Sequence, residues 1–288
     1  MLRTNRDRLV EVAVSGEVWP PALAPLPYRV DADGRAMLLP GTAGIIYNAR
    51  VGQSAYHWVG DHVEPCVSIR NREIGAEQAL HYLTCMGNQA VVTSGRAAGA
   101  RGVVTGEHAH LMVDFPDDAL PELCIGDQVQ IRALGTGLEL LDYPGIALRK
   151  VSPALLDRLR IRELGDGRIE VPVAAIIPPY LMGSGMELGA DYVDQDIMTN
   201  DEAVVRELGL DRLRVGDLVA VLDHDHTANR GYRRGAVVIG LVNHANSSYL
   251  GHGPGCMALL ACRDPLIAPV VREGSNLADY LEIGSKGC

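Results

Sequence analysis

Short aliphatic runs separated by glycine are the feature that most limits how this chain can fold. The 288 residues include 32 glycines, roughly one in nine, and glycine readily adopts the backbone conformations of tight turns. Between the turns lie runs rich in valine and similar residues, which favour strands. We expect strands at residues 10–14, 90–93, 102–105, 111–115, 129–133, 169–173, 218–222 and 236–242. The chain has one Phe and two Trp, so its core must be mainly aliphatic.

Few helices are expected, and their ends are marked by capping residues. One helix should cover residues 75–86, where apolar residues recur at helical spacing before Gly87. Others should begin at Ser152, which precedes a proline, and near Asp201, where acidic residues fill the first turn. A short fourth helix should cover residues 276–282.

A repeated pattern suggests two similar halves. The pattern Leu-x-x-Leu-x-Ile-Gly-Asp-x-Val-x-Ile at 120–131 recurs in closely related form at 210–221. Each copy predicts a turn that leads into a half-buried strand, with its Asp bonded to the local backbone. A second echo, 101–106 and 234–240, occurs in the opposite order, so a simple tandem duplication is not supported. We predict an α+β, β-rich chain: two mixed β modules (barrel- or sandwich-like) with a few short helices, at 1–158 and 159–288.

Charge and cysteine content limit the partners and the compartment. With 36 acidic and 26 basic residues the net charge is -10, whereas nucleic-acid and anionic-membrane surfaces need basic patches. We therefore expect a small-molecule substrate, no nucleic acid and no membrane. The chain starts without an apolar signal core, and its six cysteines show no CxxC spacing, so a cytoplasmic protein with reduced thiols is predicted. A homo-oligomer is also expected.

Eight of the nine histidines fall into four short clusters. The first, at 56–66, includes Asp61, His62 and Glu64. A proton carrier near pH 7 held by a carboxylate is what general acid–base chemistry requires. We predict that His62 activates water, oriented by Asp61 or Glu64. The alternative is an exposed loop with incidental charge.

The second cluster holds His108 and His110. If a strand begins at His108, both imidazoles lie on one face and form half of a transition-metal site. Such pairs also arise by chance.

The third cluster is Asp223-His224-Asp225-His226, at the end of a predicted strand. Continued alternation would place Asp223 and Asp225 on one face, where they could bind a metal or transfer protons. Arg230, Tyr232 and Arg234 follow, and their side chains could hold an anionic substrate or neutralise the carboxylates.

The fourth cluster runs from His244 to Cys256 and contains three glycines within five residues. Gly253 and Gly255 can turn backbone N–H groups toward one point, where they could hold a carboxylate or a developing oxyanion. His252 lies between two glycines and has no evident packing role. Cys256 could be a nucleophile, but a buried cysteine at a strand start is favoured.

Two further segments are weaker candidates. Ser184 and Gly185 lie in a glycine-containing loop that no helix pattern follows, so no nucleotide cofactor is expected. The series Asp191, Asp194 and Asp196 could bind a hard cation, but it lacks the spacing of a calcium loop, and a solvated loop is favoured. P-loop, His-Glu-x-x-His and Gly-x-Ser-x-Gly motifs are absent from the sequence.

Taken together, these stretches resemble an uncharacterised prokaryotic family, domain of unknown function 4438. The resemblance spans residues about 45 to 262. It implies a β-rich fold without a settled activity, and a small or aliphatic residue where this chain has Cys66 and Cys256. It rests on Gly60-Asp-His-Val-Glu-Pro65, Val103-Val-Thr-Gly-Glu-His108, Gly126-Asp127, Asp142-Tyr143-Pro144, Met182-Gly-Ser-Gly185 and Gly251-His-Gly-Pro-Gly255.

The leading hypothesis from the residues is a hydrolase for an amide, lactam or related C–N bond, assisted by a divalent metal (Zn, Mn or Mg). Its motivation is the combination of imidazoles, carboxylates and a glycine nest without a motif for an organic cofactor. One alternative is a cofactor-independent isomerase, cyclase or lyase, and another is a non-catalytic small-ligand-binding oligomer. The expected catalytic residues are Asp61, His62, Glu64 and His252; the metal ligands His108, Asp223 and Asp225; and the substrate contacts Ser184, Gly185, Arg230, Tyr232, Arg234, His244, Gly253, Gly255 and Cys256.

Overall fold

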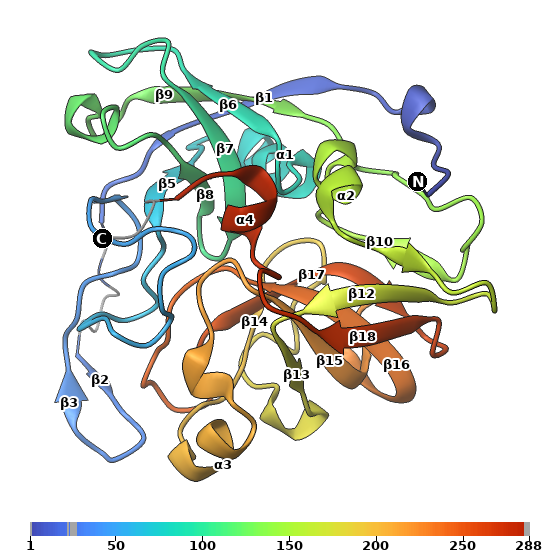
Figure 1. Ribbon diagram of the computed structural model, residues 1–288. Coiled ribbons are helices and arrows are strands. Elements are labelled where there is room, and N and C mark those ends of the chain that lie inside the picture. Colours follow the sequence, from blue (N-terminus) through green and yellow to red (C-terminus); the bar gives the residue numbers. More distant parts are fainter. Residues whose placement is uncertain (1, 22, 24–27, 285–288) are drawn as a thin grey trace.

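The computed structural model describes residues 2–21, 23 and 28–284, and the N-terminal part of the chain forms a closed antiparallel barrel (Figure 1). The barrel strands follow the order β1-β9-β6-β7-β8-β5, and β1 pairs with β5 to close the ring. A short strand, β4, pairs with β5 beside this contact. The bounds are β1 (Val12–Val18), β4 (Ile45–Ile46), β5 (Cys66–Arg70), β6 (Gln89–Val92), β7 (Arg101–Glu107), β8 (Leu111–Asp114) and β9 (Gln128–Ala133).

The C-terminal part is built on a mixed sheet with the order β10-β17-β16-β15-β13, and β14 also pairs with β17. A smaller sheet, β11-β12-β18, and a hairpin, β2-β3, complete the strands of the described residues (Figure 1). The bounds are β2 (Arg29–Val30), β3 (Ala36–Met37), β10 (Ile146–Leu148), β11 (Arg162–Glu163), β12 (Ile169–Val173), β13 (Ala175–Ile177), β14 (Gln195–Asp196), β15 (Leu218–Asp225), β16 (Gly231–Val242), β17 (Gly255–Cys262) and β18 (Ile267–Val271).

The helices are short, and three of the four α-helices begin at capping residues that the sequence marks. The first has no side-chain cap and ends at Leu83, three residues before its predicted end. The Ser152 hydroxyl accepts a hydrogen bond from the Leu155 N–H, and Asp201 and Asn276 cap their helices in the same way. The α-helices are α1 (Ile74–Leu83), α2 (Pro153–Arg158), α3 (Glu202–Glu207) and α4 (Leu277–Leu281), and the 3-10 turns are η1 (Arg6–Arg8), η2 (Leu120–Glu122), η3 (Pro179–Leu181) and η4 (Leu210–Arg212).

The prediction of a β-rich fold with a few short helices is therefore confirmed. Every predicted strand is present, although several differ in length, and β16 begins five residues earlier than expected. For β17, which is buried along its whole length, the sequence suggested a strand start at Cys256 but not the extent of the strand. Its Met-Ala-Leu-Leu-Ala run lacks the β-branched residues that distinguish a strand from a buried helix.

The core is continuous from the barrel into the second sheet. One cluster of buried residues joins barrel residues such as Ile131 to Leu218 and Ala220 of β15. The alternate residues of β15, Val219 and Val221, pack in a second cluster on the opposite face. Because successive strand residues point to opposite faces, β15 is covered on both sides. The second sheet therefore lies inside the molecule, and side chains on both of its faces are buried.

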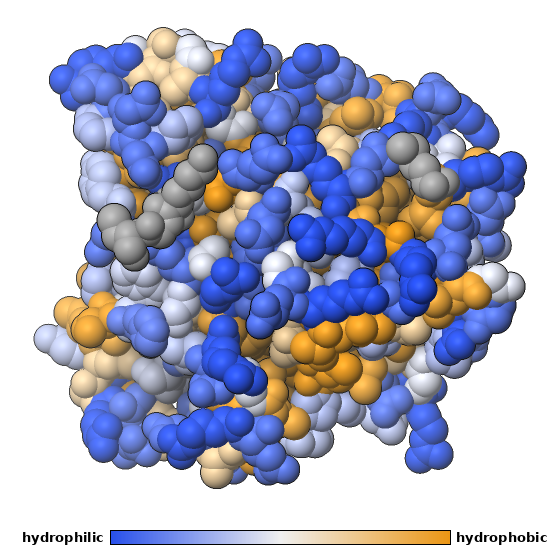
Figure 2. Space-filling model, viewed as in Figure 1, coloured by the Kyte–Doolittle hydropathy of each residue, from blue (hydrophilic) through white to orange (hydrophobic). Residues whose placement is uncertain are grey.

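The exposed surface is mostly polar on the face drawn in Figure 2, where hydrophobic residues gather over β12 and β18. Among the described residues, no helix is long and apolar enough to cross a membrane, and α1, the longest, has ten residues.

The two copies of the repeated pattern adopt the same turn. In each copy a 3-10 turn precedes a glycine with positive φ, 91° at Gly126 and 93° at Gly216. The next residue then accepts a backbone N–H: Asp127 from Cys124 and Asp217 from Arg214, each at 2.8 Å. The prediction that these aspartates bond the local backbone is confirmed. Asp217 also accepts a hydrogen bond from Asn276, which ties the start of α4 to this turn.

We expect Asp217→Ala to lower the free energy of unfolding by about 1–3 kcal/mol, because the partly buried Arg214 N–H loses its acceptor and the buried Asn276 amide loses one of its two. Urea unfolding followed by circular dichroism measures this change. Asp211→Ala, at an exposed position in η4, is the matched control and should change stability by less than about 0.5 kcal/mol. Equal effects of the two substitutions would contradict the assigned role of Asp217.

Candidate functional site

Four histidines from separate segments meet where the barrel joins the second sheet. His62 lies in the loop before β5, His108 directly follows β7, His244 follows β16, and His252 lies in the loop before β17. The His62 ring centroid lies 5.2, 5.1 and 4.9 Å from those of His108, His244 and His252, and the rings of His108 and His244 are 4.4 Å apart. The residues that the sequence clusters singled out thus share one centre.

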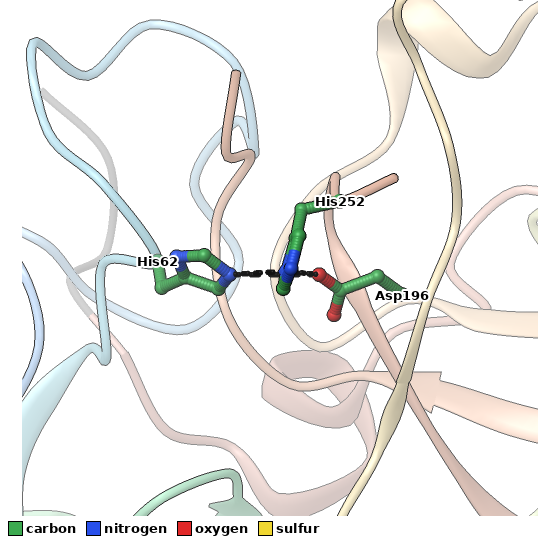
Figure 3. A group of neighbouring side chains, drawn as sticks. All are labelled: His62, Asp196 and His252. Carbon is green, nitrogen blue, oxygen red and sulfur yellow. Dashed lines mark hydrogen bonds and ion pairs between the residues drawn. The ribbon is translucent and has the colours of Figure 1, made fainter. Parts of the chain in front are cut away.

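Two buried carboxylates, Asp194 and Asp196, complete the centre, and each is 4% exposed. The expectation of a solvated loop at these residues is wrong, because β14 pairs with β17 and covers them. Alternation along this segment turns both carboxylates inward, whereas Gln195 between them bonds His224 on the other side. Asp196 Oδ2 lies 2.7 Å from His252 Nδ1 and 3.5 Å from His62 Nε2 (Figure 3).

Glu64 holds two imidazoles in place behind the centre. Its carboxylate accepts hydrogen bonds from His108 Nδ1 at 2.8 Å, His110 Nδ1, the Ser68 hydroxyl and the Ala43 N–H. Burial alone would raise the pKa of Glu64, but these donors hold it well below its usual value. From the sequence, Glu64 was one of two carboxylates expected to orient His62. In the structure it binds His108 and His110 instead.

Asp61 orients His62, as the sequence predicted. Asp61 Oδ1 lies 2.9 Å from His62 Nδ1 and 2.5 Å from the Ser247 hydroxyl. Despite burial, hydrogen bonds from His62 and Ser247 lower the pKa of Asp61 to about 2. With Nδ1 bound to Asp61, the free nitrogen of His62 faces Asp196 and His252. His62 also adopts a positive φ of 48°, which is rare for a residue with a side chain and is found most often where surrounding contacts require it.

Glycines let the backbone approach these side chains. A Cβ at Gly255 would collide with the Asp194 carboxylate and His244 Nε2, and one at Gly253 would collide with the Ile197 carbonyl. The Gly253 N–H points to Asp196 Oδ2 at 3.4 Å. The glycine-rich loop was expected to hold an anion such as a carboxylate. The carboxylate that it contacts is Asp196 of the protein itself.

The ligand atoms of the centre form two groups suited to a metal ion. In the His252 group, the ligand atoms of His62, Asp196 and His252 lie within 4.8 Å of one another. In the His244 group, the same holds for His108, Asp194 and His244.

The electrostatics of both groups tie the carboxylates to the imidazoles. Burial would raise the pKa values of Asp194 and Asp196, but the neighbouring imidazoles lower both. The same contacts raise the pKa of His244, against the effect of burial.

Asp223 and Asp225, predicted as metal ligands, belong to neither group. A β-bulge between Leu222 and His224, with φ of 53° at Asp223, breaks the alternation on which that prediction relied. Asp223 accepts the Gly235 N–H, and Asp225 binds Thr227 and Arg263. Their carboxylates stabilise the β15–β16 hairpin and the neighbouring strand end.

Arg230 does not face an open substrate site. Its guanidinium is buried and donates to the carbonyls of Gly185 and Asp194, each at 2.7 Å, and to that of Val193. Arg230 therefore fixes the backbone directly before Asp196. Tyr232 and Arg234 are exposed on β16, away from this contact.

Ser184 and Gly185 act through their backbone. The Ser184 N–H donates to the Gly251 carbonyl, and its carbonyl accepts the Asp196 N–H, both at 2.9 Å. A Cβ at Gly185 would crowd the Asp194 carbonyl, so this close approach of the loop to β14 requires glycine at position 185. These residues support the carboxylates of the centre through backbone hydrogen bonds and close packing.

The thiols of Cys66 and Cys256 are poor nucleophiles. Cys256 is fully buried near the start of β17, as favoured from the sequence, and burial raises its pKa to about 12. Burial likewise raises the pKa of Cys66 to about 12. Thiolate chemistry requires a lowered pKa and access, so neither residue fits it.

We expect Arg230→Met to expose residues 183–196 and to lower the free energy of unfolding by about 3 kcal/mol, because three buried carbonyls lose a charged donor. Hydrogen–deuterium exchange should accelerate in this segment relative to the wild type. Arg233→Met, at an exposed position on β16 three residues later, should leave exchange unchanged. Unchanged exchange in the Arg230 variant would contradict its role.

Two family models and one solved structure match the chain. The family model described as Domain of unknown function (DUF4438), N-terminal, matches residues 28–157, and the corresponding C-terminal model matches residues 158–281. The chain is also similar to a solved structure titled "Crystal structure of TM1086", with 42% identity, a TM-score of 0.92, and coverage of 97% of this chain and 99% of that one. No curated protein matches. The chain therefore belongs to the family of proteins with domain of unknown function 4438.

Proposed function

We propose that the protein is a divalent-metal-dependent hydrolase that cleaves an amide, lactam or related C–N bond in a small molecule. The observation that carries this proposal is the convergence of four imidazoles and two buried carboxylates on one centre. Histidine and carboxylate ligands together suit zinc, manganese and related ions.

Distances in the His252 group fit a bound ion. Its three ligand atoms are 2.7, 2.9 and 3.5 Å apart. Ligands at 2.0–2.1 Å from one ion, with angles between octahedral and tetrahedral, are separated by about 2.9–3.4 Å. Only small shifts of these side chains are needed to bind an ion.

The hydrogen bonds behind the imidazoles also fit metal ligation. His62 and His108 each direct Nδ1 to a carboxylate, Asp61 and Glu64 respectively, so their Nε2 atoms are left to face the centre. Carboxylates in this position fix the ring and raise its basicity as a ligand. In this proposal His62 is a metal ligand, which replaces the sequence-based hypothesis that it is the general base.

Buried charge supplies a further argument. Within the described residues, every ion pair of Asp194 and Asp196 is formed with a histidine. Burying two carboxylates is unfavourable by several kcal/mol per charge unless positive charge compensates them. Protonated imidazoles can supply that charge, since these contacts raise the pKa of His244, and a divalent cation would supply it while the imidazoles act as neutral ligands.

The chemistry follows from the properties of such an ion. A divalent cation held by these residues would lower the pKa of bound water and polarise a carbonyl oxygen, so that water could attack the carbon of an amide near neutral pH. The C–O bond would form first by addition to the carbonyl, and the C–N bond would then break as a proton from the water passes to the leaving nitrogen. His108 and His252 keep 18% and 20% of their side-chain surface exposed, so this side of the centre reaches solvent.

One observation favours a second function, a cofactor-independent isomerase, cyclase or lyase. Ser247, Asp61 and His62 form a hydrogen-bonded chain that could carry protons without a metal.

The test compares metal-free protein with protein reloaded with Zn²⁺, Mn²⁺ or Co²⁺, assayed on a panel of small linear amides, lactams and cyclic imides. We expect hydrolysis by the reloaded protein and at least a 100-fold lower rate without metal. His244→Ala should lose activity and metal affinity, whereas His57→Ala, at an exposed position outside the centre, should keep both.

Absence of metal binding would overturn the proposal and favour the proton-relay alternative. Tight metal binding with no hydrolysis of any substrate class would overturn the hydrolase assignment alone.

A further inference from the structure

Asp196 lies between the two candidate metal groups and faces both. Its Oδ2 is close to His252 and His62 of the His252 group, whereas its Oδ1 lies 3.4 Å from His244 Nε2 of the His244 group (Figure 3 shows the first of these groups). A carboxylate with one oxygen directed to each of two ligand sets has the arrangement of a bridge between two cations.

The His244 group is prepared for a ligand of its own. His244 is fully buried, and its Nε2 lies 3.0 Å from Asp194 Oδ2 and 3.4 Å from Asp196 Oδ1. One nitrogen of the His244 imidazole therefore faces oxygens of two carboxylates, which is the arrangement of ligand atoms around a shared cation. Its other nitrogen contacts the Ala245 carbonyl at 2.8 Å, which leaves Nε2 directed to the centre.

The surroundings keep this second position in place. Asn243 Nδ2 donates to Asp194 Oδ2 at 2.6 Å, and also to the backbone carbonyl of Glu107, the residue before His108. One amide therefore links both remaining members of the group. Gly255 adds space at the same point, because any side chain there would overlap Asp194 and His244.

We propose that the centre holds two divalent cations, one in each group, bridged by Asp196. This inference rests on the metal-dependent function proposed above and adds a second site to it. The ions would lie about 3.5–4 Å apart, the separation at which two metals share a nucleophilic water and polarise one carbonyl. The substrate is therefore a molecule whose scissile carbonyl can reach both ions.

The two positions should differ in affinity. The His244 group is fully supported by Glu64, Asn243 and the Ala245 carbonyl. In the His252 group, His252 lies on the glycine-rich loop and is the most exposed imidazole of the centre. Preorganised ligands bind more tightly, so the His244 group should fill first.

The test counts Mn²⁺ and Zn²⁺ ions per chain by equilibrium dialysis and elemental analysis of the full-length protein. Wild type should bind two ions in two steps of different affinity. His252→Ala should bind one ion with the higher affinity retained, and Asp194→Asn should lose the tighter step. His57→Ala should still bind two.

Electron paramagnetic resonance of the Mn²⁺-loaded wild type tests the bridge. Bridged ions give an exchange-coupled spectrum, which should convert to the signal of an isolated ion in His252→Ala. One ion per wild-type chain would overturn the second site, and two uncoupled ions would overturn the bridge by Asp196; either result leaves a metal-dependent hydrolase standing. Absence of any bound ion would overturn both.

Discussion

The buried charge of Asp194 and Asp196 is the constraint on which the centre depends. Both carboxylates are excluded from water, and their ion-pair partners are imidazoles. A buried carboxylate is stable only with compensating charge and hydrogen bonds. The raised pKa of His244 and the lowered pKa of Asp196 express the same requirement, because each group favours the charged form of the other. Protonated imidazoles or bound cations can satisfy it, and His244 Nε2, with an oxygen of Asp194 at 3.0 Å and one of Asp196 at 3.4 Å, lies where either would be stabilised.

The fold meets this constraint with backbone features rather than with a large cavity. Pairing of β14 with β17 buries Asp196, and Arg230 fixes the carbonyl of Asp194. The glycines at 253 and 255 allow the loop before β17 to pass close to these side chains. The barrel contributes His62 and His108 from its rim, so neither half of the chain contains the complete ligand set.

The sequence predicts local features well and non-local ones poorly. Helix starts at Ser152, Asp201 and Asn276 were readable because a capping residue acts within its own turn. The histidine clusters identified His62, His108, His244 and His252 because unusual residues concentrated in short loops are visible without a structure.

Asp194 and Asp196 were visible as a pair, but their burial depends on pairing with a strand some sixty residues away, which no local pattern reveals. Conversely, Asp223 and Asp225 seemed suitable only while strict alternation was assumed, and the bulge in β15 removed it. Arg230 was read as a substrate contact because a sequence does not show that backbone carbonyls surround a guanidinium.

An anomalous-scattering experiment on crystals of zinc-loaded protein, with data on both sides of the zinc absorption edge, tests the central claim most directly. The account predicts edge-specific peaks between Asp196 and the rings of His62, His252 and His244. Absence of any zinc peak at these residues, with zinc in excess and the side chains arranged as described, would contradict it.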